Sequence, residues 1–214
     1  AEDCGIPKIE EFNRGDNFGN AYFQMNQRRG TRCSGARAFL HPIMSRTNLT
    51  VLTEAQVQRL TFTKSNNSPR CTGITVNTPT GVKNFNADKE VILAAGTIGS
   101  PQLLQLSGIG AASHLNKLGI EQIHELGGVG ENLQDHLQVR TIYRVHNTVT
   151  LNQRFNSVAG KAWMGLEYLL FKRGPMTMPP SQLGAFAKSD SSLAMPDLEW
   201  HVQPLSLDKF GEPL

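Results

Sequence analysis

The stretch from Val91 to Gly110 constrains the fold of this chain more than any other part of its 214 residues. It opens with an uninterrupted apolar run, residues 91–95, of the kind that forms a fully buried strand inside a parallel sheet. Gly96 follows, where the lack of a side chain lets a ligand or another backbone approach closely. Ser100 and Pro101 then predict a helix start, with serine as N-cap and proline at the first helical position. A buried strand, a turn of small residues and a helix N-terminus together form the usual geometry for holding a nucleotide at the carboxyl end of a sheet.

The segments on both sides of this stretch predict an α/β fold, with α+β character in the part that the chain covers. Upstream, apolar and polar residues alternate between turn-forming residues, which predicts a β-meander. Downstream, Ser107-Gly108-Ile109-Gly110 stops the helix, and further helices and strands follow. The expected strands span residues 57–62, 71–77, 82–86, 139–145, 183–188 and 198–205, and the expected helices span residues 101–106, 111–118 and a longer segment from the N-cap Asn156 or Ser157 to Gly174.

Several motifs of the chain resemble those of the glucose–methanol–choline (GMC) oxidoreductases, which are FAD enzymes. The central motif is long and mixes residue types, so a chance match is improbable. The matching residues are Gly96, Ser100-Pro101, Leu103-Leu104 and residues 107–110, with residues 17–19, 27–32 and 48–53 upstream and residues 127–136 downstream. The resemblance is strong from Phe12 to Arg140 and fades toward the C-terminus.

The resemblance implies a division of the chain into two parts. Residues 1–140 would be part of an FAD-binding, Rossmann-like domain with an inserted β-meander, and residues 141–214 would begin a substrate domain built on an antiparallel sheet. The sequence has no strand–Gly-x-Gly-x-x-Gly–helix unit for a dinucleotide pyrophosphate, and Gly127-Gly128-Val129-Gly130 is interpreted as a turn. The family's catalytic His-His or His-Asn pair is expected beyond Leu214. We therefore expect an internal fragment that neither holds FAD tightly nor turns over by itself.

Three residues are expected to contact the adenosine half of FAD. The resemblance places Val57 where family members contact adenine through main-chain N–H and C=O groups, and an ordinary strand valine is the alternative interpretation. It places Ala95 and Gly96 beside the adenosine, where small side chains let the ligand touch the backbone. Tight packing of a strand against a helix would favour the same small residues.

Two further residues are expected at the substrate cavity. In the family, the segment that ends in Asp135-His136 passes near the flavin and the cavity, so His136 is a candidate polar wall residue; a hydrogen-bonded structural histidine is the alternative. Choline-oxidising members tend to have a glutamate two residues after this histidine, where a carboxylate neutralises the quaternary ammonium. This chain has the neutral Gln138, which favours a neutral alcohol over choline unless another acidic group compensates.

Composition excludes several other classes of protein. A formal net charge of +3 is too small to indicate nucleic-acid binding, and the basic residues Arg28, Arg29 and Arg32 lack the interleaved aromatic residues of a single-strand binding surface. The chain has three cysteines without a Cys-x-x-Cys spacing, and its six histidines show no metal-ligand spacing. Free thiols favour a cytoplasmic location, with or without peripheral attachment to a membrane. No apolar run approaches the length of a transmembrane segment.

The sequence therefore predicts the central segment of an FAD-dependent enzyme that oxidises a primary alcohol to an aldehyde by hydride transfer to the flavin. The expected partners are a small-molecule alcohol and an electron acceptor that the sequence does not identify. Two alternatives are carried forward. One is a member of the same family that acts as a hydroxynitrile lyase, retaining FAD without redox turnover. The other is a stand-alone module without catalytic activity.

Overall fold

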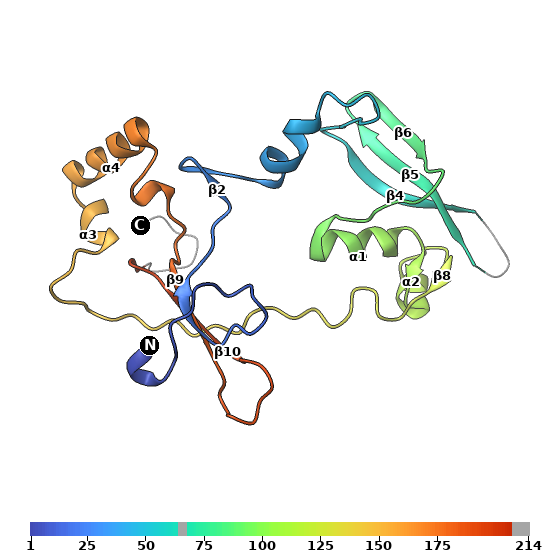
Figure 1. The fold of residues 1–214 in the computed structure, drawn as a ribbon. Coiled ribbons are helices and arrows are strands. Elements are labelled where there is room, and N and C mark those ends of the chain that lie inside the picture. Colours follow the sequence, from blue (N-terminus) through green and yellow to red (C-terminus); the bar gives the residue numbers. More distant parts are fainter. Residues whose placement is uncertain (64–67, 207–214) are drawn as a thin grey trace. The chain divides into compact units, whose positions relative to one another are not determined.

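The computed structural model describes residues 1–63 and 68–206, and the chain forms two compact units in it (Figure 1). The central unit spans residues 50–139. The terminal unit combines residues 1–49 with the chain from residue 140 onward. Residues 1–49 pack with the part of the chain from Arg140 onward instead of with residues 50–139. The reason is strand pairing, because a strand at residues 19–22 hydrogen-bonds with a strand at residues 183–187.

The central unit alternates strands with short helices. It contains β4 (Gln56–Thr63), β5 (Arg70–Thr78), β6 (Gly81–Asn86), α1 (Gly96–Leu106), β7 (Ile109–Gly110), α2 (Ala112–Lys117) and β8 (His124–Glu125). The predicted β-meander is confirmed, because β4, β5 and β6 pair antiparallel in chain order. The predicted helix at residues 111–118 is confirmed as α2, and Gly119 follows it with a φ of 66° in the left-handed region.

A buried hydrogen bond joins the meander to α1. The backbone N–H of Leu60 in β4 donates to Ser107 Oγ, 2.8 Å away, directly after the last residue of α1. The same hydroxyl donates to the carbonyl of Leu103 one helical turn earlier. Leu60, Leu103 and Ser107 are all buried, so this serine satisfies a backbone donor where water does not reach.

The buried strand predicted at residues 91–95 is not formed in the described structure. No described segment pairs with these residues, and Ile92 is 80% exposed. An interior strand of a parallel sheet needs hydrogen-bonding neighbours on both edges, and the described residues supply none here. The helix also begins earlier than predicted, at Gly96 with Ala95 as N-cap, and Ser100 lies inside it. The Ser100 hydroxyl instead accepts a hydrogen bond from the Ala95 N–H at 3.1 Å.

Gly108 makes the tight link between α1 and the next parallel pair. Its φ is 83°, and a Cβ at this position would overlap the carbonyl oxygen of Glu121. This close approach aligns β7 with β8, which pair in parallel as Ile109 with His124 and Gly110 with Glu125. Among the described residues, parallel pairing is limited to this ladder and one bridge between Lys8 and Asn20. The Rossmann arrangement therefore stays a prediction, and what the structure shows is a mixture of helices and strands.

The terminal unit is built around a three-stranded antiparallel sheet in the order β1-β9-β10. Phe12 packs against the rings of Phe23 and Phe186 beside this sheet, with ring centroids 5.4 Å and 4.8 Å apart. The elements of the unit are η1 (Glu2–Cys4), β1 (Gly19–Tyr22), β2 (Gln27–Arg28), β3 (Thr31–Arg32), η2 (Ala36–Leu40), η3 (His41–Ile43), α3 (Leu151–Phe155), α4 (Val158–Phe171), η4 (Pro175–Thr177), β9 (Leu183–Ala187) and β10 (Leu198–Val202).

The sequence patterns located three elements of the terminal unit. The longer helix is confirmed as α4, whose N-cap Ser157 accepts a hydrogen bond from the Gly160 N–H, and the strands at 183–188 and 198–205 are confirmed as β9 and the shorter β10. The strand predicted at residues 139–145 is wrong, because these residues are exposed and form no strand pairing. None of the helices among the described residues has the length and apolar character that crossing a bilayer requires.

Replacing Gly108 with alanine is expected to destabilise the full-length protein more than replacing Gly119. Both glycines have a positive φ, so each alanine costs about 1–2 kcal/mol in backbone strain. Around Gly119 a Cβ would meet nothing within 4 Å, whereas at Gly108 it would meet backbone, which adds about 1–3 kcal/mol. Urea unfolding of the two variants measures the difference. Equal losses would contradict the close approach at Gly108.

Candidate functional site

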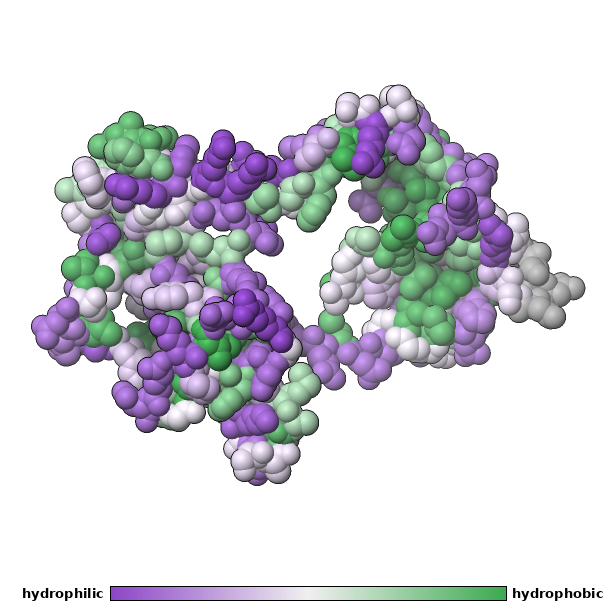
Figure 2. Space-filling model, in the orientation of Figure 1, coloured by the Kyte–Doolittle hydropathy of each residue, from purple (hydrophilic) through white to green (hydrophobic). Residues whose placement is uncertain are grey.

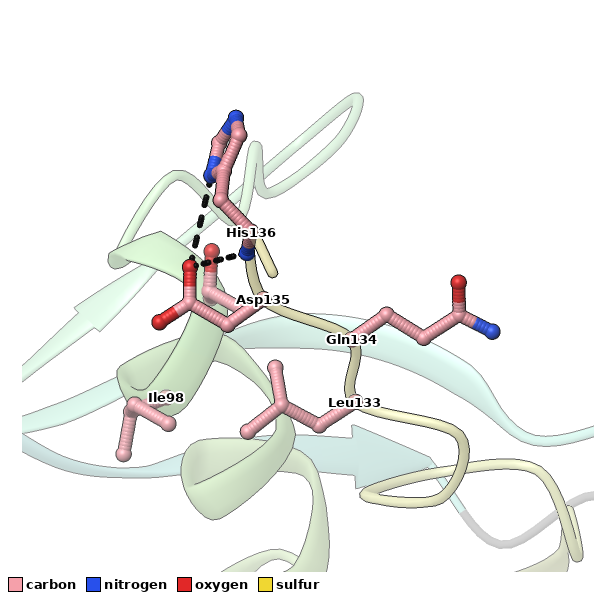
Figure 3. A pocket seen from close by; sticks show the side chains of 6 residues that line it. Ile98, Leu133, Gln134, Asp135 and His136 are labelled. Carbon is pink, nitrogen blue, oxygen red and sulfur yellow. Dashed lines mark hydrogen bonds and ion pairs between the residues drawn. The ribbon is translucent and has the colours of Figure 1, made fainter. Parts of the chain in front are cut away.

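A hollow of about 630 Å³ lies in the central unit at the N-terminal end of α1 (Figure 3). Two of its walls come from segments that lie apart in the sequence. The first turn of α1 contributes Thr97 and Ile98, and the segment after the glycine-rich turn contributes Leu133, Gln134, Asp135 and His136. All six lining residues are exposed, so this hollow opens widely to solvent. Apolar side chains and a few polar groups share its lining.

The start of α1 presents backbone to solvent beside this hollow. Ala95 and Gly96 are both exposed, and a Cβ on Gly96 would meet no atom within 4 Å. The first N–H groups of a helix have no partner within the helix, and the helix dipole gives this end a partial positive charge. The helix therefore begins with uncovered backbone that a ligand can approach, in a position that favours negative charge.

The opposite wall is held to α1 by the glycine-rich turn. Gln105 of α1 donates from Nε2 to the carbonyl oxygen of Val129 at 3.1 Å, and Val129 is buried. Gly130 follows with a φ of 83°, and a Cβ there would lie 2.7 Å from Gln105 Nε2. The expectation that residues 127–130 form a turn is confirmed. This turn directs the chain toward the segment at residues 133–136, so α1 carries one wall of the hollow and anchors the other.

Asp135 and His136 form a local hydrogen-bonded pair at the edge of the hollow (Figure 3). The backbone N–H of His136 donates to Asp135 Oδ1 at 2.7 Å, and His136 Nδ1 lies 3.4 Å from the same oxygen. The backbone hydrogen bond, followed by the hydrogen bond and charge of the imidazole, lowers the pKa of the Asp135 carboxyl below its ordinary value. The carboxylate therefore keeps its negative charge to more acidic pH, and the stabilisation it provides is lost only when the pH falls through the lowered pKa. Both side chains are exposed, so water screens this effect.

The predicted site residues separate into two groups in the structure. His136 lines the hollow, and Ala95 and Gly96 directly precede Thr97 in its wall. Gln138 is exposed and does not line it. Val57 lies in β4, paired with Val76 of β5 and followed by a β-bulge, and it does not line the hollow either.

Of the six residues that line the hollow, sequence reasoning named His136 as a site residue and missed five, namely Thr97, Ile98, Leu133, Gln134 and Asp135. A signal for two of them was present, because Thr97 and Ile98 directly follow the small-residue turn and therefore lie in the first exposed turn of the helix. Leu133 had no such signal, since its place depends on the turn that precedes it. Within the described ranges, no group of three or more His, Cys, Asp or Glu residues is positioned to hold a metal ion.

Comparison with known proteins gives a consistent family match. The family model described as GMC oxidoreductase matches residues 1–138. The chain is 35% identical to the oxygen-dependent choline dehydrogenase of Photobacterium profundum, over 99% of the chain and 36% of that relative. It is also 35% identical to the alcohol dehydrogenase [acceptor] of Pseudomonas putida, over 95% of the chain and 37% of that relative. The chain thus spans little more than a third of the length of these relatives.

Solved structures agree with the sequence match. A formate oxidase of Aspergillus oryzae, studied for the modification of its FAD, superposes with a TM-score of 0.73 at 30% identity, covering 86% of this chain and 31% of that chain. A pyridoxine 4-oxidase from Mesorbium loti superposes with a TM-score of 0.65 at 26% identity, covering 88% of this chain and 32% of that chain. The motifs around α1, the match over residues 1–138 and the curated relatives together show that this chain belongs to the GMC oxidoreductase family.

Proposed function

We propose that this chain is the central segment of an FAD-dependent enzyme that oxidises a primary alcohol to an aldehyde. The observation that carries the proposal is the hollow at the start of α1, where the signature motif of the family and the segment ending in His136 lie side by side. Relatives named as choline and alcohol dehydrogenases support oxidation over cyanohydrin cleavage. The alternative of a hydroxynitrile lyase has no such support among the named relatives.

The residues at the start of α1 fit one side of a flavin nucleotide. Ala95 and Gly96 leave backbone uncovered, and the space beside Gly96 is free of atoms for 4 Å around a would-be Cβ. Together with Thr97 and Ile98 they would form a wall against the adenosine half of FAD. Val57 would contribute main-chain groups from β4, whose edge away from β5 has no partner strand in the described sheet. When bound, FAD supplies the acceptor for the hydride that leaves the alcohol carbon.

The protein's own contribution would be to orient the substrate and to shape the charge around it. His136 would form a polar wall of the substrate cavity, with Asp135 accepting the hydrogen bond of its backbone N–H and lying beside Nδ1. Asp135 Oδ1 lies within reach of a hydrogen bond from Nδ1 when that nitrogen carries a proton. The family resemblance implies that a histidine takes the hydroxyl proton, and the proposal assigns this role to none of the described residues.

Anaerobic reduction of the full-length protein tests the proposal. Addition of an aliphatic primary alcohol without oxygen should bleach the absorbance of a bound flavin, because the hydride moves to the cofactor and cannot leave it. The aldehyde should form in an amount equal to the reduced flavin. An unchanged flavin spectrum together with release of cyanide from a cyanohydrin would show lyase activity and contradict the proposal.

Replacing Ala95 with leucine is expected to weaken FAD binding in the full-length protein. Ala95 is exposed at the start of α1, so the larger side chain extends into the space that the proposal assigns to the adenosine. Overpacking of this kind costs about 1–3 kcal/mol, which corresponds to a roughly fivefold to hundredfold higher Kd for FAD. Ala194→Leu is the control, because Ala194 is an exposed alanine in the other unit. Equal flavin content in both variants would remove Ala95 from the site.

The neutral Gln138 distinguishes this chain from the pattern expected of choline oxidation. A quaternary ammonium that leaves water needs a counter-charge, and a carboxamide supplies none. A neutral primary alcohol has no such requirement. We therefore propose that the preferred substrate is a neutral alcohol, although several relatives bear the name choline dehydrogenase.

Gln138→Glu is expected to shift the preference of the full-length enzyme toward choline. A carboxylate near the ammonium group should raise kcat/KM for choline relative to its uncharged analogue 3,3-dimethyl-1-butanol by about tenfold, equivalent to about 1.4 kcal/mol. Gln122→Glu adds the same charge at another exposed position of the central unit, to which no substrate role is assigned, and should leave the ratio unchanged. A wild-type enzyme that already prefers choline over the analogue would refute the assignment.

A further inference from the structure

The side chain of Gln105 links α1 to the glycine-rich turn at residues 127–130. Gln105 lies in the last turn of the helix and is half-buried. Its Nε2 donates a hydrogen bond to the carbonyl oxygen of Val129, which is 3.1 Å away and 24 residues further along the chain. The first turn of α1 forms one wall of the hollow. The same helix therefore reaches the segment that forms the other wall through this amide.

The acceptor of this hydrogen bond is a buried residue. Val129 is buried, as are Leu103, Ile109 and Leu115 of the same unit. Figure 2 shows hydrophobic residues gathered over the part of the central unit that contains α1 and α2. A carbonyl that water does not reach needs a donor from the protein. Among the described residues, Gln105 is the donor that the Val129 carbonyl has.

Two glycines fix the place of the Gln105 side chain. A Cβ on Gly110 would lie 3.4 Å from Gln105 Cγ, so the stem of the side chain passes β7 at van der Waals distance. A Cβ on Gly130, whose φ is 83°, would lie 2.7 Å from Nε2. The amide is the mobile end of a flexible side chain. An alanine at position 130 would therefore push the amide away from the Val129 carbonyl.

The hydrogen bond of Gln105 holds the end of the turn from which the second wall extends. The start of the turn is held by backbone, because the N–H of Leu126 donates to the carbonyl oxygen of Gly110 at 3.0 Å. In the described ranges, the segment at residues 133–136 makes hydrogen bonds only within itself. Its place relative to α1 therefore depends on the turn before it, and so on Gln105.

We propose that Gln105 is a positioning residue for alcohol oxidation and acts through the Val129 carbonyl. It would keep the wall that contains His136 at a fixed place relative to the start of α1 (Figure 3). The inference rests on the function proposed above, in which the start of α1 faces the adenosine and His136 faces the substrate. Small displacements matter in such a site, because a misplacement of about 1 Å can slow a reaction about a hundredfold.

Gln105→Met in the full-length protein tests the proposal. Methionine has a similar length and helix propensity but no N–H to donate. Anaerobic reduction of the flavin at low alcohol concentration should become about tenfold slower, because the wall at residues 133–136 loses its fixed place. Amide hydrogen exchange should become faster at residues 131–136. The Kd for FAD should keep its wild-type value, since the start of α1 is unchanged.

Two further substitutions separate positioning from a general loss of stability. Gln102→Met removes an amide from an exposed position of the same helix and should leave flavin reduction and exchange unchanged. Gln105→Lys places an ammonium donor within reach of the Val129 carbonyl and should restore most of the reduction rate. Equal losses in the methionine and lysine variants at position 105 would show that the hydrogen bond is not responsible, and the proposal would be wrong. Thermal unfolding verifies that each variant is folded.

Gly130→Ala approaches the same contact from the other side. It should also slow flavin reduction, whereas Gly119→Ala, with a similar positive φ and open space around it, should not. Combining Gly130→Ala with Gln105→Met should cost less than the sum of the two effects, because both remove one interaction.

The outcome for the wild-type protein separates this inference from the proposed function. A wild-type flavin that no primary alcohol reduces would contradict the proposed function itself. A wild-type flavin that is reduced, together with wild-type reduction and exchange in Gln105→Met, would overturn only the role of Gln105. It would show that another part of the polypeptide holds residues 133–136 in place.

Discussion

The central unit depends on one buried hydrogen bond, from the N–H of Leu60 to Ser107 Oγ. A buried backbone donor without a hydrogen-bond partner lowers the free energy of unfolding by about 1–3 kcal/mol, so loss of this serine would destabilise the β-meander. Because Ser107 also donates to the Leu103 carbonyl, the bond fixes the C-terminal end of α1 against β4. The opposite end of the same helix forms a wall of the hollow, and Gln105 between them holds the turn that supplies the other wall. The signature motif of the family therefore holds both walls of the hollow in place and also forms one of them.

This dependence explains why the motif mixes residue types. Gly108 is required where two backbones meet, Ser107 where a strand needs an acceptor, and Leu103 where the helix faces the core. Each residue meets a different structural requirement, and all of these requirements fall within a short stretch of sequence. The motif residues that this stretch shares with GMC enzymes therefore have defined roles in packing and hydrogen bonding. This holds even though the predicted strand before them is not formed in the described structure.

Local chemistry decided which elements could be predicted from the sequence. The β-meander, the N-cap at Ser157 and the left-handed Gly119 follow from patterns within a few residues, and the structure has them. The strands predicted at residues 91–95 and 139–145 were wrong because a strand requires a pairing partner, and distant parts of the chain determine that partner. Of the candidate site, His136 and the small residues at the start of α1 could be found from the motif, whereas Leu133 depends on the turn anchored by Gln105. The grouping of residues 1–49 with the C-terminal part likewise rests on pairing between β1 and β9, which no local pattern specifies.

The uncovered segment at residues 91–95 also affects how this polypeptide must be handled. It is an uncharged, apolar pentapeptide without strand pairing among the described residues, and its Ile92 is 80% exposed. Such a strand pairs readily with an identical strand from another molecule, which is the first step toward ordered aggregates. In an isolated preparation of these 214 residues, this segment is therefore an aggregation hazard that a solubilising fusion partner would counter.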